Sequence, residues 1–162
     1  MNFASVLGLP FAIGLVAGLR SFTAPAAVCW AAHLGWLHLE GSKLSWLGTT
    51  WVVWITTILA IFELFADKQS WIGARTKPGP LIDRLIMGAI CGGALGFSNN
   101  HDPVPGAIAG AVGALISTYG GYYTRRQVVA SLKVPDTRIG LIEDFVAIIT
   151  AFLLVFKLAL PI

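Results

Sequence analysis

Only one charged side chain, that of Arg20, lies among the first 39 residues of this chain, and the stretch around it is otherwise apolar. Placing a guanidinium at bilayer depth costs roughly 3 to more than 10 kcal/mol, depending on the reference state. Such an arginine needs a compensating partner and marks a candidate functional site. As one helix, segment 3–37 would be about 50 Å long, whereas the hydrocarbon core is only ~30 Å thick. A single straight helix therefore does not fit.

A break in the helix next to this arginine removes the mismatch in length. Gly18, just before it, is a poor helix former. After it, Thr23 suits an N-cap and Pro25 suits the first turn of a new helix. The sequence therefore predicts two short helices, 3–19 and 24–37, with the arginine in the hinge between them.

The composition fixes the class of protein. Hydrophobic residues make up 56% of the chain and charged residues 12%, and the mean hydropathy is +0.77. These values are typical of a polytopic membrane protein. Four further apolar segments are each close to the roughly 17–25 residues that span a bilayer; they are 46–66, 81–97, 104–123 and 139–160. We therefore predict an all-α transmembrane bundle of about six short helices, forming a single domain over 1–162.

The basic residues predict the orientation of this bundle. Eight of them lie in or beside the loops 67–84 and 124–139, whereas the loops 38–45 and 98–103 contain only Lys43. The positive-inside rule places the two basic loops in the cytoplasm of a multi-pass protein, and we expect a bacterial inner membrane. Six spans put both termini outside, whereas one long first helix gives five spans. The net charge of +3 reflects this topology, so no nucleic-acid partner is expected. The eight residues are Lys68, Arg75, Lys77, Arg84, Arg125, Arg126, Lys133 and Arg138.

The two halves of the chain, 1–80 and 81–162, share some features. A shift of 80 residues superposes Pro25 on Pro105 and places the first hinge on the polar turn at 99–103. Three helices per half would give the halves opposite topologies, as in many transporters. The correspondence fails in the third helix. An inverted repeat of three helices each is therefore one alternative, and an unrelated pair of halves is the other.

Small residues recur every four positions in the fourth and fifth predicted helices. This glycine-zipper pattern lines one face of each helix and lets backbones approach closely in lipid. Packing of the two helices within one chain is the first interpretation. A homodimer through the same face is the second. The glycines are Gly88, Gly92, Gly96, Gly106 and Gly110.

Most of the remaining ionisable residues fall at the predicted cytoplasmic end, where they can meet. They are either interfacial ion pairs or parts of a ligand site. We expect Arg20 to lie within ion-pair reach of Glu63 or Glu143, in a charged pocket capped by loop 75–78. The candidate ligand-binding residues are Arg20, Ser21, Thr23, Glu63, Asp67, Lys68, Arg75, Thr76, Glu143 and Asp144.

Four blocks of the sequence resemble a bacterial integral-membrane family known only as a domain of unknown function. The blocks are Gly-Leu-Arg-Ser-Phe-Thr-Ala-Pro at 18–25, Phe-Glu-Leu-Phe-Ala-Asp-Lys at 62–68, Arg-Thr-Lys-Pro at 75–78 and Glu-Asp-Phe-Val-Ala-Ile at 143–148. The resemblance covers nearly the whole chain and brings no substrate or activity with it. It implies that the polar residues singled out above, together with Pro25 and Pro78, belong to a shared pattern.

Motifs of known enzymes are absent from the sequence, so we predict no catalytic residue, metal ligand or cofactor. Three function classes remain. The first is a transporter or binder of a small anionic or amphipathic, lipid-like ligand. The second is a membrane scaffold or assembly subunit, and the third is an intramembrane enzyme that uses paired carboxylates. We favour the first, because an arginine beside a helix N-terminus suits an anionic group. Membrane lipids are the other expected partners.

Overall fold

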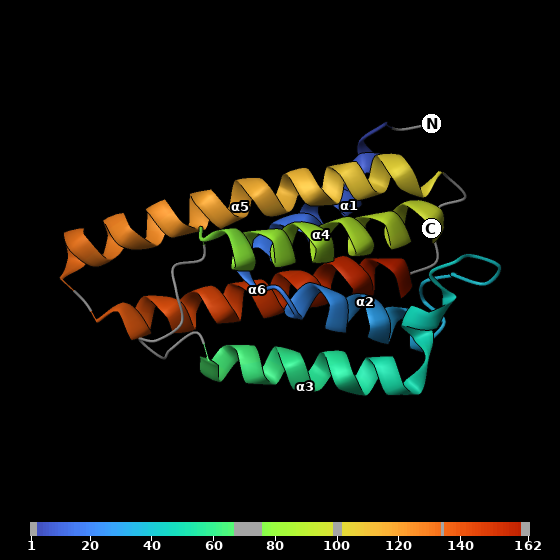
Figure 1. The fold of residues 1–162 in the computed structure, drawn as a ribbon, viewed down its shortest axis with the longest axis horizontal. Coiled ribbons are helices and arrows are strands. Elements are labelled where there is room, and N and C mark those ends of the chain that lie inside the picture. Colours follow the sequence, from blue (N-terminus) through green and yellow to red (C-terminus); the bar gives the residue numbers. More distant parts are fainter. Residues whose placement is uncertain (1–2, 67–75, 99–101, 134, 160–162) are drawn as a thin grey trace.

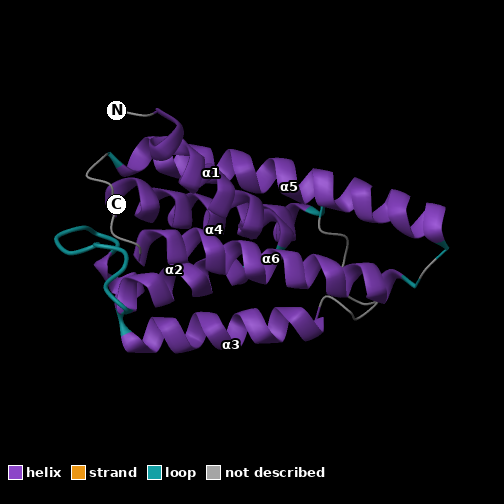
Figure 2. Cartoon of the chain, turned by 180° about the vertical axis from the view of Figure 1, so that it is seen from behind, coloured by secondary structure: helices purple, strands orange, loops and turns teal. Residues whose placement is uncertain are grey.

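The computed structural model describes residues 3–66, 76–98, 102–133 and 135–159, and within these ranges the fold is all-α (Figures 1 and 2). Six α-helices and one 3-10 turn form the described part, which confirms the predicted class and helix number. In chain order they are α1 Phe3–Leu19, α2 Thr23–His33, η1 Ser45–Gly48, α3 Thr50–Ala66, α4 Pro78–Ser98, α5 Pro103–Leu132 and α6 Asp136–Ala159.

The predicted break beside Arg20 is confirmed, since α1 ends at Leu19 and α2 begins at Thr23. The second helix is shorter than predicted, because it ends at His33 and not at position 37. Gly35 follows with a φ of 75°. This left-handed conformation is accessible to glycine and lets the chain leave the helix.

α5 is longer than the predicted segment 104–123, so the loop predicted over 124–139 was too long. The helix continues to Leu132, so that Arg125 lies on the helix. Arginine and glutamine are good helix formers, and polar residues beyond an apolar segment do not end a helix. The end comes at Lys133, which has a φ of 52°.

Successive helices run in opposite directions along the long axis of the molecule (Figure 1). The ends that face the two basic loops, namely the C-terminal ends of α3 and α5 and the N-terminal ends of α4 and α6, lie on one side. This arrangement agrees with the six-helix prediction. α4, α5 and α6 are long and apolar enough to cross a membrane, and α1 and α3 contain shorter apolar helices. The inverted repeat stays a prediction.

Close packing of α1, α4 and α5 depends on glycine. A Cβ atom at Gly92 of α4 would overlap the carbonyl oxygen of Gly106 in α5, and one at Gly110 would overlap that of Gly88. A Cβ atom at Gly14 of α1 would overlap the carbonyl oxygen of Gly110. The small-residue faces are therefore used within the chain, as the first interpretation predicted. A homodimer stays a prediction.

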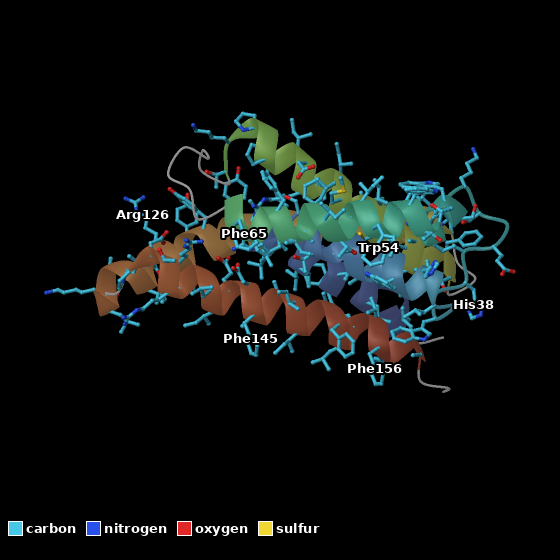
Figure 3. The ribbon with its side chains drawn as sticks, turned by 90° about the horizontal axis from the view of Figure 1, so that it is seen from below. His38, Trp54, Phe65, Arg126, Phe145 and Phe156 are labelled. Carbon is cyan, nitrogen blue, oxygen red and sulfur yellow. The ribbon has the colours of Figure 1, made fainter. Side chains whose placement is uncertain are left out.

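The outer surface of the bundle is apolar. Trp54 and Phe65 on α3, together with Phe145 and Phe156 on α6, point outward (Figure 3). Large exposed apolar side chains over so much of a surface are unusual for a protein surrounded by water. They are the side chains that lipid would contact. We call the zone of the bundle that these exposed apolar side chains surround the apolar belt.

Candidate functional site

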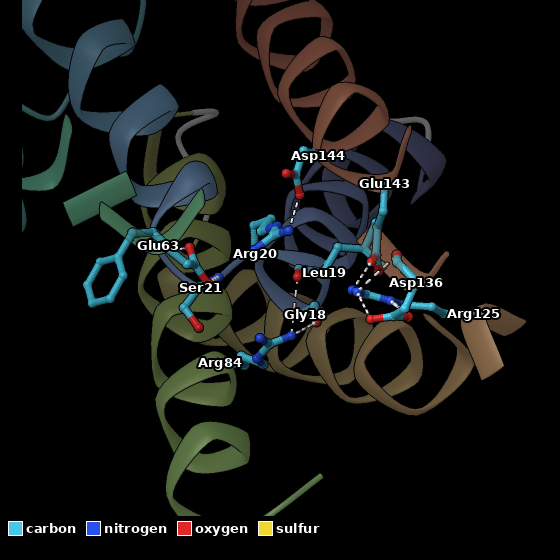
Figure 4. Close-up of polar contacts among 11 residues, drawn as sticks. Gly18, Leu19, Arg20, Ser21, Glu63, Arg84, Arg125, Asp136, Glu143 and Asp144 are labelled. Carbon is cyan, nitrogen blue, oxygen red and sulfur yellow. Dashed lines mark hydrogen bonds and ion pairs between the residues drawn. The ribbon is translucent and has the colours of Figure 1, made fainter. Parts of the chain in front are cut away.

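Arg20 lies in the break between α1 and α2 and is almost fully buried, with 1% of its surface exposed. Its guanidinium forms an ion pair with the carboxylate of Asp144 on α6 (Figure 4). A carboxylate partner was expected, and Glu63 or Glu143 had been named for that role, whereas the observed ion pair is to Asp144, the neighbour of Glu143. Adjacent residues of a helix point about 100° apart. Asp144 faces the bundle, whereas Glu143 faces α5.

Glu63 connects the C-terminal part of α3 to the start of α2. Its two carboxylate oxygens accept hydrogen bonds from the backbone N–H groups of Ser21, at 2.7 Å, and Phe22, at 2.9 Å. The N-cap residue of α2 is Phe22, which offers no capping side chain. Glu63 therefore supplies from another helix the negative charge and the acceptors that the N-terminus of α2 favours.

Arg84 of α4 binds the other side of the same break. It is 3% exposed. Its Nη1 donates to the carbonyl oxygens of Gly18, at 2.5 Å, and Leu19, at 3.2 Å. Thr118 of α5 also donates to the Gly18 carbonyl, at 3.1 Å. These donors satisfy the last carbonyls of α1, and the cation is favourably placed at the negative end of that helix.

A second polar cluster joins α5 to α6 nearer the end of the bundle. Arg125 makes two bonds to the carboxylate of Asp136, at 2.6 and 2.8 Å, and a longer contact of 3.4 Å to Glu143. Asp136 is 65% exposed, so this pair is strongly screened by solvent and contributes little to stability. Because Glu143 precedes Asp144, the two clusters meet on α6.

The cluster at the break, which we call the inner cluster, consists of Arg20, Ser21, Glu63, Arg84 and Asp144, and it lies within the apolar belt. Glu63 is flanked by Phe62 and Phe65, which are 63% and 67% exposed, and Asp144 precedes Phe145, which is 66% exposed. The two carboxylates face inward while the neighbouring side chains face outward. Buried charges of this kind are costly unless they are paired, and inside a membrane they usually mark a functional site.

The comparisons with known proteins identify the family. The family model described as a domain of unknown function, DUF4126, matches residues 7–162. The chain belongs to this family. No curated protein and no solved structure matches it. The resemblance noted in the sequence is thereby confirmed, and the roles of residues in this DUF4126 chain rest on its geometry.

The structure brings together part of the predicted site. Arg20, Ser21, Glu63 and Asp144 meet at the break, and Thr23 is buried in the first turn of α2. Glu143 belongs to the second polar cluster, with Arg125 and Asp136. Thr76 lies half-buried in the turn before α4. Asp67, Lys68 and Arg75 lie outside the described residues.

Three polar residues of this DUF4126 chain were missed as site residues, namely Arg84, Thr118 and Arg125. Arg84 had been placed at the start of the 81–97 segment and interpreted as part of an interfacial ion pair and as a cation beside the first basic loop. Arg125 was missed because its helix was expected to end earlier. Thr118 gave no signal beyond being a polar residue in an apolar helix.

The arrangement offers two kinds of chemistry. Arginine and helix N–H groups bind anions through charge-assisted hydrogen bonds. The carboxylates of Glu63 and Asp144 accept hydrogen bonds from backbone N–H groups and from a guanidinium. Together these groups form a polar site with both signs of charge at the level of the apolar belt.

Proposed function

We propose that this DUF4126 chain is a multi-pass protein of the bacterial inner membrane that binds a small anionic or amphipathic, lipid-like ligand at the break between α1 and α2. The supporting observation is the position of the Glu63 carboxylate, which accepts from two backbone N–H groups at the start of α2. A helix N-terminus is a ready anion site. Here an internal carboxylate occupies it beside the guanidinium of Arg20.

The carboxylate or phosphate of a ligand would offer the same oxygen atoms as Glu63. Such a ligand competes with Glu63 for the amides of Ser21 and Phe22, and Arg20 adds a second positive partner. Binding then depends on movement of the Glu63 side chain away from α2. The ligand's anionic group would lie near the cytoplasmic edge of the apolar belt.

Transport of the ligand is the further step that the helix break favours. Transporters commonly hold their substrates at discontinuous helices near a repeat interface, with helix N-termini directed at anionic groups. The break at 20–22 and the opposite directions of α1 and α4 fit that arrangement. Transport is tested by uptake of the bound ligand into proteoliposomes.

The proposed topology predicts the outcome of reporter fusions. A reporter active only in the cytoplasm should work when inserted after Thr76 or Lys133, because both positions lie in the basic loops. The same reporter fused after Ile162 should be inactive, whereas a reporter that requires export should show the reverse pattern. Activity of the cytoplasmic reporter at both Lys133 and Ile162 would contradict the six-span topology.

Ligand binding predicts concentration-dependent thermal stabilisation. The purified chain should be titrated with a panel of anionic lipids, phosphorylated metabolites and organic anions, and its Tm measured. A ligand at about 100 times its Kd should stabilise the fold by about 2.7 kcal/mol. The shift should be smaller for Arg20→Lys, because an ammonium lacks the bidentate fork. It should be unchanged for Lys43→Ala in the opposite loop. The proposal fails if no compound in the panel raises the Tm.

A further inference from the structure

An apolar groove of about 420 Å³ lies between α2, α3 and α6. Its walls include Ala27 and Trp30 of α2, Ala60 and Leu64 of α3, and Phe152 of α6. The volume falls within the roughly 300–1,000 Å³ of typical ligand pockets, which are also mainly apolar. The groove is therefore large enough for a ligand of its own.

One end of the groove borders the charged site. Thr23, which lines it, follows Ser21 by two residues, and Leu64 is the neighbour of Glu63. Ile148 also lines it and lies one helical turn beyond Asp144, on the same face of α6. Each of the three helices that form the groove therefore has a lining residue close in sequence to a residue of the charged site.

The rest of the groove runs away from the charges. Along α6 its lining continues through Ala151 and Phe152 to Val155. Trp36, which comes just after the end of α2, also lines it. Phe152 is 56% exposed and belongs to the apolar outer surface. The charged residues therefore lie near one end of the groove, and its outer side opens on the apolar surface of the bundle.

We propose that this groove holds the acyl chain of a single-chain amphiphile whose anionic head group lies at the break between α1 and α2. The inference rests on the proposed function and names the class of its ligand. A groove of about 420 Å³ with apolar walls suits an alkyl chain, and the arginine and helix N-terminus at the break suit an anionic head group. One alkyl chain is the occupant that we assign, and the comparison with a two-chain lipid tests this choice.

Binding of palmitoyl lysophosphatidic acid to the full chain tests the proposal. The protein is first transferred from detergent into amphipol, so that no single-chain detergent competes. Native mass spectrometry should then show one lysolipid per chain. Dipalmitoyl phosphatidic acid, which has the same phosphate and a second chain, should bind about tenfold or more weakly, on the scale by which apolar pockets discriminate.

Two variants and one control locate the chain in the groove. Ala60→Phe fills the groove from α3 and should weaken lysolipid binding about tenfold or more, and Ala27→Leu should act in the same direction from α2. Ile58→Phe is the matched control, because Ile58 lies on α3 but is 61% exposed and does not line the groove. Its affinity should stay within about twofold of that of the natural chain.

The possible results separate this inference from the proposed function. Unchanged lysolipid binding by both groove variants, or equal affinity for the two-chain lipid, overturns the assignment of the groove. Glycerol phosphate, the head group without a chain, then reports on the charged site alone. If it raises the Tm of the natural chain and of Ala60→Phe alike, the anion site stands without the groove. If neither it nor the lysolipid binds, the assignment of the groove fails, and the panel of anions decides whether the charged site binds another ligand.

Discussion

Replacement of Arg20 by alanine is expected to lower the free energy of unfolding by about 3–5 kcal/mol, because it leaves the buried carboxylate of Asp144 without its ion-pair partner. Asp144 is 6% exposed and lies inside the apolar belt, so solvent cannot replace the guanidinium. Urea or thermal unfolding of the purified chain measures the loss. A decrease of this size is a large fraction of the total stability of most proteins, so the yield of folded protein should also fall.

Removal of the partner charge should rescue the variant in part. The double variant Arg20→Ala with Asp144→Asn no longer contains the buried carboxylate that has lost the guanidinium, and it should be more stable than Arg20→Ala alone. Glu143→Gln is the matched control, because Glu143 is the adjacent acid but contacts Arg125. Added to Arg20→Ala, Glu143→Gln should not restore stability. Equal rescue by the two neutralised acids would show that Asp144 is not the specific partner of Arg20.

The free energy of unfolding of Arg20→Lys should lie between that of Arg20→Ala and that of the natural chain. Lysine keeps the positive charge, but a compact ammonium cannot present the planar fork of donors that a guanidinium presents to carboxylates. The comparison therefore separates charge from geometry. Stability equal to that of the natural chain would show that only the charge at this position matters.

Local sequence features were sufficient to predict the break at Arg20. A lone cation, a glycine before it and good N-terminal helix residues after it all lie within one short segment, so no distant contact was needed. The helix number followed from apolar segments of the right length. The end of α5 was misjudged because the prediction used the end of the apolar run, whereas Lys133 in the left-handed conformation ends the helix.

The partners within the site could not be read from the sequence in the same way. The choice between Glu143 and Asp144 depends on the rotation of α6 about its own axis, which is set by packing against α1 and α2. The acceptors of Arg84 are backbone carbonyls of Gly18 and Leu19, and backbone groups leave no mark in a side-chain pattern. Capping of α2 by Glu63 likewise depends on a contact between residues far apart in the chain.

Gly92→Leu is expected to destabilise the bundle by about 3 kcal/mol or more, because α4 and α5 are too close for any side chain at this position. Even a Cβ atom there would overlap the carbonyl oxygen of Gly106, which is backbone and cannot rotate away. The two helices would have to separate along their shared face. The same substitution at Gly120 of α5, where nothing lies near the added atom, should have little effect. Thermal unfolding compares the two.

Alanine at two adjacent positions provides a sharper comparison. At Gly93 the nearest atoms to an added Cβ are 3.5 Å away, which is an ordinary contact, whereas at Gly92 the added atom overlaps Gly106. Gly93→Ala should therefore be neutral or gain up to about 1 kcal/mol from helix propensity, while Gly92→Ala should be destabilising. If Gly92→Leu instead keeps full stability and converts a dimer into monomers in size-exclusion chromatography, this face joins two copies of the chain. Loss of stability without any change in mass means that the glycines hold α4 against α5 within one chain.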